Sequence, residues 1–95
     1  MEFGRYVVLS TAHVRCATAE QLTAWAQLPP SDQPLVVAST HYGWFLHTRA
    51  VVDPGDPRLP DELGAILAFG RAQGCDYVLL DCDGDRTDAL AVFPW

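Results

Sequence analysis

The sequence contains no lysine. All six basic residues are arginines, twelve residues are acidic, and the formal net charge is −6 at pH 7. Proteins that bind DNA or RNA directly neutralise phosphates with clustered lysine and arginine. This composition therefore argues against direct contact with a nucleic acid. It favours a basic protein partner, because surplus negative charge attracts such a surface over a distance.

Long apolar runs and a cysteine framework are also missing. No stretch approaches the roughly 20 apolar residues of a membrane-spanning helix, and residues 1–9 lack the pattern of a secretory signal. Cys16, Cys75 and Cys82 are an odd number of cysteines at no framework spacing, which is typical of reduced thiols. We therefore expect a cytoplasmic protein that makes no membrane contact.

The overall composition is typical of a single folded domain. The chain has 95 residues, of which 49% are hydrophobic and 19% are charged. This balance predicts a single globular domain over residues 1–95 rather than a disordered chain. A domain of this size buries about 60–65% of its unfolded surface, which leaves little room for a deep catalytic cavity.

Short β-branched runs alternate with two segments of helical periodicity. Thr18 and Gln21 have the spacing of a capping box, which predicts a helix beginning near Ala19 and ending before Pro29. A second helix should begin at about Pro60 and end near Gly74. Its inner stripe is predicted to be Leu63, Ile66, Leu67 and Gly70. Between the helices, the proline-rich segment 53–60 is expected to be a surface loop.

The remaining runs predict five strands, at residues 6–10, 35–40, 44–48, 77–82 and about 89–93. Turn signals at residues 41–43 and at Asp83-Gly84 predict two hairpins. The order is then β-α-β-β-α-β-β. We expect an α+β fold with a mainly antiparallel sheet of about five strands and both helices packed on one face.

A cluster of acids follows the fourth predicted strand. Five carboxylates lie within thirteen positions and are opposed only by Arg86; they are Asp76, Asp81, Asp83, Asp85 and Asp88. Alternate acids resemble a calcium loop, but Arg86 and Val92 stand where that loop needs glycine and glutamate. We expect no metal here. Two interpretations stay open, a solvated acidic turn and an acidic contact surface for a basic partner.

Aromatic residues are frequent in the predicted hairpin around residue 43. Trp44 and Phe45 are adjacent on one strand, so their side chains must point to opposite faces. Core packing explains one of them. The other is a candidate anchor for a protein partner, since aromatic anchors are typical of protein interfaces.

The polar turn after the first strand raises a catalytic and a metal alternative. Ser10, Thr11, His13 and Cys16 contain a nucleophile and a base, but no triad motif surrounds them. His13 and Cys16 are also the only closely spaced pair of zinc-type ligands. We expect a structural turn in which His13 bonds to the backbone, with no metal, no cofactor and no catalysis. A small hydrolase remains the enzymatic alternative.

Several segments together carry a family resemblance: residues 9–13, 42–45, 74–77, 81–84 and 93–95. The set resembles a family of small domains of unknown function carried by plasmids and prophages of proteobacteria. The resemblance implies an accessory protein of a mobile element, similar to anti-CRISPR factors. We therefore expect a non-enzymatic inhibitor whose acids mimic nucleic acid on a CRISPR effector. The alternative is a regulatory or structural accessory domain that self-associates; both a monomer and a homodimer are allowed.

Overall fold

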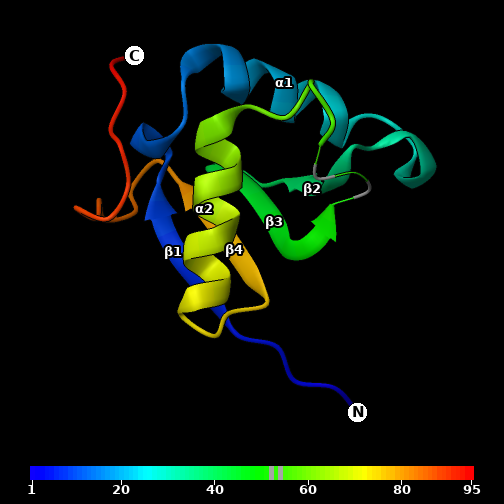
Figure 1. Ribbon diagram of the computed structural model, residues 1–95, viewed down its shortest axis with the longest axis horizontal. Coiled ribbons are helices and arrows are strands. Elements are labelled where there is room, and N and C mark those ends of the chain that lie inside the picture. Colours follow the sequence, from blue (N-terminus) through cyan, green and yellow to red (C-terminus); the bar gives the residue numbers. More distant parts are fainter. Residues whose placement is uncertain (52, 54) are drawn as a thin grey trace.

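A mixed sheet covered by two helices forms the body of the protein. The computed structural model describes residues 1–51, 53 and 55–95. The strands are β1 (Tyr6–Ser10), β2 (Leu35–Ser39), β3 (Gly43–Val51) and β4 (Tyr77–Asp81), and the helices are α1 (Cys16–Ala26) and α2 (Asp61–Ala72). Short 3-10 turns occur at Thr11–His13 (η1) and Pro30–Asp32 (η2). Figure 1 shows α2 lying across the sheet. The α+β class and both helices are as predicted.

The sheet has four strands in the described part of the chain, in the order β1-β4-β3-β2. β3 pairs antiparallel with both β2 and β4, whereas β1 and β4 are parallel. The expectation of a mainly antiparallel sheet missed this parallel pair. β4 lies between two strands that run in opposite directions, so it has to be parallel to one of them.

The predicted fifth strand at residues 89–93 is wrong. Asp81 ends β4, and the following turn leads out of the sheet instead of into a hairpin. The reason is topological: β4 is a central strand, and β1 and β3 already occupy both of its edges. Residues 84–95, the C-terminal segment, instead cross η1, where the Phe93 N–H donates to Ala12 O at 2.8 Å.

Both helices pack on the same face of the sheet, as predicted. That face contributes Leu9, Val37, Leu46, Val78 and Leu80 to one continuous core, and the helices contribute Leu22, Trp25, Leu63, Ile66 and Leu67. α2 lies close to β3 and β4 at Gly70. A Cβ atom there would lie 2.8 Å from methyl groups of both Thr48 and Val78, so this contact requires glycine.

The first residue of α1 differs from the prediction, whereas that of α2 agrees with it. α1 begins at Cys16 and not near Ala19, because Thr18 is not its N-cap. The Thr18 hydroxyl and the Arg15 N–H donate instead to the carboxylate of Glu62 on α2, at 3.0 and 2.9 Å. α2 begins as predicted, and Gly74 has the expected positive φ of 74°. Position 54 of the predicted loop 53–60 lies outside the described residues.

Candidate protein-binding surface

The helices leave the opposite face of the sheet uncovered. We call this surface the open face and define it by the residues whose side chains alternate with those of the core: Tyr6, Val8, Val36, Ala38, Phe45, His47, Tyr77, Leu79 and Asp81. Its margins are exposed, with Tyr6 57%, Val8 40% and Val36 52% accessible. In Figure 1, α2 lies in front of the sheet and the open face is behind it.

Aromatic rings cross the open face from β1 to β3. Phe45 and Tyr77 are stacked, with ring centroids 5.0 Å apart. Tyr6 lies 6.1 Å from Phe45, and His47 meets the edge of Tyr77 at 5.0 Å. Rings that contact one another across strands hold their positions, so the face presents a pre-ordered aromatic surface.

Trp44 and Phe45 point to opposite faces, as their adjacency predicted. Trp44 packs against the core, and its indole N–H donates to Thr23 Oγ1 at 3.2 Å. Phe45 lies on the open face. The structure therefore separates the two candidate anchors and leaves Phe45 as the one that a partner could contact.

The five predicted acids are likewise divided. Asp76 precedes β4 and Asp81 ends it, so the two are about 17 Å apart at the usual rise per strand residue. The Asp76 carboxylate accepts the Arg5 N–H at 3.0 Å and lies 3.8 Å from Arg49 Nη1. Asp76 is thus neutralised locally and does not belong to the same surface as the others.

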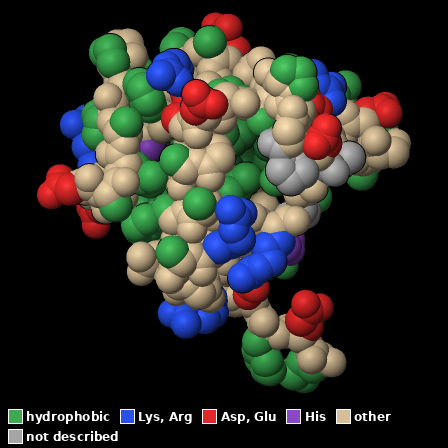
Figure 2. Space-filling view, viewed as in Figure 1, with side chains coloured by type: hydrophobic (Ala, Val, Ile, Leu, Met, Phe, Trp, Pro, Cys, Tyr) green, Lys and Arg blue, Asp and Glu red, His purple; other side chains and the backbone are tan. Residues whose placement is uncertain are grey.

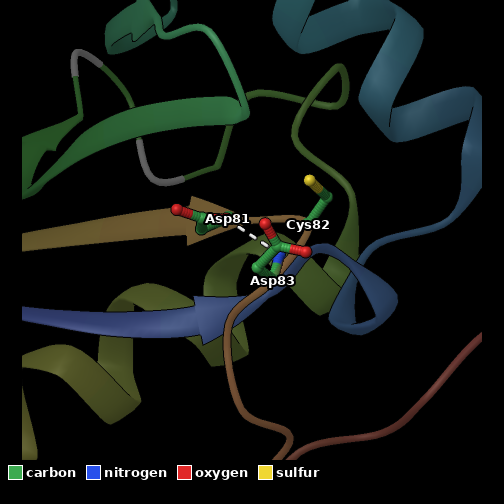
Figure 3. Close-up of side chains that lie close together, drawn as sticks. All are labelled: Asp81, Cys82 and Asp83. Carbon is green, nitrogen blue, oxygen red and sulfur yellow. Dashed lines mark hydrogen bonds between the residues drawn. The ribbon is translucent and has the colours of Figure 1, made fainter.

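The other acids gather at the C-terminal end of β4. We call Asp81, Asp83, Asp85 and Asp88 the acidic end. Asp81 is on the open face and accepts the Asp83 N–H at 2.8 Å (Figure 3). Asp83, Asp85 and Asp88 are exposed, and among the described residues none of the four lies in an ion pair. The acidic end is therefore an unneutralised negative surface next to the aromatic one.

Asp81, Cys82 and Asp83 bring a thiol and two carboxylates within 4.8 Å of one another. The three residues are consecutive, so the turn itself explains their proximity (Figure 3). The hydrogen bond between Asp81 and Asp83 organises this turn without an ion, and no buried polar group points into it. The grouping gives no reason to assign a metal.

His13 holds the C-terminal segment on the body of the protein. The imidazole is 1% exposed, its Nδ1 donates to Ala91 O at 2.8 Å, and its Nε2 accepts the Thr87 N–H at 3.1 Å. Both ring nitrogens are therefore engaged by backbone. Neither is free to act as a base toward Cys16 or to ligate zinc, so the His13–Cys16 pair lacks the geometry for a hydrolase or a metal site.

The turn that begins the C-terminal segment packs directly on β1. A Cβ at Gly84 would lie 2.7 Å from the Leu9 carbonyl group, and the Ser10 N–H donates to Asp85 O at 3.0 Å. These contacts fix where the carboxylates of the acidic end emerge. Sequence reasoning found the acids but missed Tyr6 and Tyr77; the alternation within residues 6–10 and 77–81 was the available signal.

Comparisons with known proteins add a family. A model described as the C-terminal domain of a family of unknown function, DUF5983, matches residues 6–95. No curated protein and no solved structure matches the chain. No helix among the described residues is long and apolar enough to span a membrane.

Proposed function

We propose that this chain, which belongs to the DUF5983 family, is a non-enzymatic domain that binds a cationic protein surface in the cytoplasm. One observation carries the proposal. Phe45 and Asp81, an aromatic anchor and the first carboxylate of the acidic end, lie on the same face of the sheet, the one that the helices do not cover.

The open face supplies the contact area of the proposed interface. Protein interfaces are enriched in aromatic residues at their centre, surrounded by a polar rim. Phe45 and Tyr77 are stacked at the middle of the open face, and Asp81 is at its border. A partner would therefore contact a rigid aromatic centre while its basic residues face the acids at the border.

The acidic end orients the partner and raises the rate of association. Exposed carboxylates contribute little binding energy one by one, but together they accelerate association with a basic surface, and this effect weakens as salt increases. The partner in this proposal is a protein with an arginine- and lysine-rich channel for nucleic acid. In its most specific form it is a CRISPR effector, blocked by a mobile-element inhibitor whose carboxylates occupy the place of phosphates.

The test is affinity capture from host lysate with mass spectrometry, followed by binding measurements with the purified captured protein. The triple variant Asp83→Asn, Asp85→Asn and Asp88→Asn removes charge from the acidic end. The matched control is Glu2→Gln, Glu20→Gln and Asp32→Asn, which removes the same charge elsewhere on the exposed surface. We expect the first triple to slow association at low salt by about tenfold or more and the control to slow it far less.

The aromatic contribution is tested by Phe45→Ser against Tyr42→Ser. Tyr42 is an exposed ring in the turn between β2 and β3, outside the open face. We expect Phe45→Ser to weaken binding by at least tenfold, the usual cost of losing an aromatic anchor, and Tyr42→Ser to change it little. Equal binding by wild type, the acidic triple and Phe45→Ser would exclude this surface as the interface.

A further inference from the structure

The two outer strands of the sheet, β2 and β1, differ in whether other groups bond their outward-facing backbone. At the β2 edge, the side-chain amide of Gln33 accepts the Val37 N–H and donates to Val37 O, both at 3.4 Å. It also donates to Trp25 O at 3.0 Å. Gln33 thus bonds the outward backbone groups of Val37, in the middle of β2, and covering an exposed edge is a known way of blunting it.

The β1 edge has no such cover along most of its length. Arg5 O accepts the Tyr77 N–H, so Arg5, Val7 and Leu9 direct their backbone groups toward β4. The backbone groups of Tyr6, Val8 and Ser10 therefore face outward. At Ser10 the N–H donates to Asp85 O at 3.0 Å, and the residue is also the N-cap of η1, so within the described part of the chain Tyr6 and Val8 are the β1 residues whose outward backbone groups remain for another strand. In Figure 1 the C-terminal segment lies beside the tip of β1, and no ribbon follows the rest of its outer side.

We propose that β1 pairs antiparallel with β1 of a second copy of this chain. The register follows from the free groups. Tyr6 lies opposite the second copy's Val8, and Val8 lies opposite the second copy's Tyr6. The outward N–H and C=O groups of Tyr6 and Val8 in both copies then all form hydrogen bonds, and the existing bond between Ser10 and Asp85 is kept. The two-fold axis passes between the two Val7 residues.

Charge favours a second copy in this orientation. Arg5 immediately precedes β1, and Asp85 is bonded beside its last residue. Antiparallel pairing brings Arg5 of each copy next to Asp85 of the other, whereas parallel pairing would place like charges together. Tyr6 and Val8, which are 57% and 40% exposed, would also contact their counterparts across the junction. Since each copy carries −6, general repulsion opposes the contact, and we expect a reversible dimer.

This dimer is independent of the proposed function. The two-fold axis is perpendicular to the sheet, so the open faces of both copies lie on the same side of one eight-stranded sheet and stay accessible. A variant of β1 should therefore change the mass in solution without removing the surface proposed to bind a cationic partner.

The first test is sedimentation equilibrium over a range of concentrations. We expect wild type to approach twice the mass of one chain and Val8→Pro to stay at the mass of one chain. The Val8 N–H makes no bond to β4, so proline should be tolerated within the monomer but should prevent pairing. Val8→Thr, which keeps the N–H, is the matched control and should dimerise. A wild type that stays monomeric, or a Val8→Pro variant that dimerises normally, would overturn the proposal.

The second test needs no proline in the strand and decides the outcome if Val8→Pro fails to fold. Arg5→Glu and Asp85→Arg each replace two attractions per dimer by two repulsions. We expect each to raise the dissociation constant of the dimer by about tenfold and the double variant to restore it. Arg49→Glu, at the end of β3, is the control and should leave it unchanged. No rescue by the double variant would contradict the antiparallel register.

Discussion

Replacing His13 by alanine should release the C-terminal segment from the rest of the protein. The imidazole is the only buried histidine among the described residues, and it bonds residues 87 and 91 at 3.1 and 2.8 Å. Both bonds connect positions more than seventy residues apart in the sequence. Their loss therefore acts on tertiary structure and not on a local turn.

The expected cost follows from these contacts. Each hydrogen bond contributes about 0.5–1.5 kcal/mol net, and leaving the Thr87 N–H without an acceptor adds a further desolvation cost of about 1–3 kcal/mol where water cannot enter. Together they predict a loss of about 3 kcal/mol in the free energy of unfolding, a large fraction of the 5–15 kcal/mol typical of a domain. His13→Phe, which fills the same space without ring nitrogens, should cost about as much.

Urea unfolding measures the free energy of unfolding, and the rate of trypsin cleavage measures how far the C-terminal segment is released. Since the chain has no lysine, trypsin cleaves only after arginine, and Arg86 is its only site beyond Arg71. We expect cleavage after Arg86 to accelerate in His13→Ala while cleavage elsewhere changes less. His41→Ala, an exposed histidine, is the control. Stability and cleavage after Arg86 that match this control would refute the assignment of His13 as the anchor.

Three other substitutions test packing and charge. Glu62→Gln removes a charged acceptor that joins the starts of both helices, and we expect urea unfolding to show a loss of about 2 kcal/mol. Gly70→Ala should cost about 1 kcal/mol net, because overpacking exceeds the gain in helix propensity; Gly64→Ala, which meets open space, should instead stabilise, and destabilisation by both would contradict this explanation. The Arg58 side chain is hydrogen-bonded to Asp56 and lowers the pKa of that carboxyl. The contribution of this pair to folding stability is therefore complete above the pKa of an unfolded aspartate and is lost as the pH falls through the lowered pKa of the folded protein. Arg58→Gln should return this pKa upward in a carbon-13 NMR titration, and an unchanged value would exclude the pair as the cause.

Sequence patterns predicted correctly those features that depend only on residues close together in the chain. The stripe Leu63, Ile66, Leu67 and Gly70 is buried as expected, because an amphipathic helix on one sheet face has only one way to bury its apolar side. The opposite orientations of Trp44 and Phe45 followed from strand geometry alone. In each case the decisive information lies within a few residues.

The failures depend on long-range pairing. The run 89–93 looks like a strand, but the order of the sheet leaves it no edge next to β4. Thr18 looks like an N-cap, but its hydroxyl donates to Glu62, 44 residues away. The acids form one group in the sequence, yet Asp76 pairs with Arg49 at the other end of β4. Topology decides all three, and sequence spacing does not contain it.

The side chain of Gln33 has a consequence for aggregation. Filaments and amyloid grow when a sheet offers a template at both of its borders, so that each added chain exposes a new one. Here the outward backbone groups of Val37, in the middle of one border, are bonded by an amide from the same chain. In the proposed dimer any further strand would have to add at β2, where it would compete with Gln33 for the Val37 groups, and this competition opposes open-ended polymerisation.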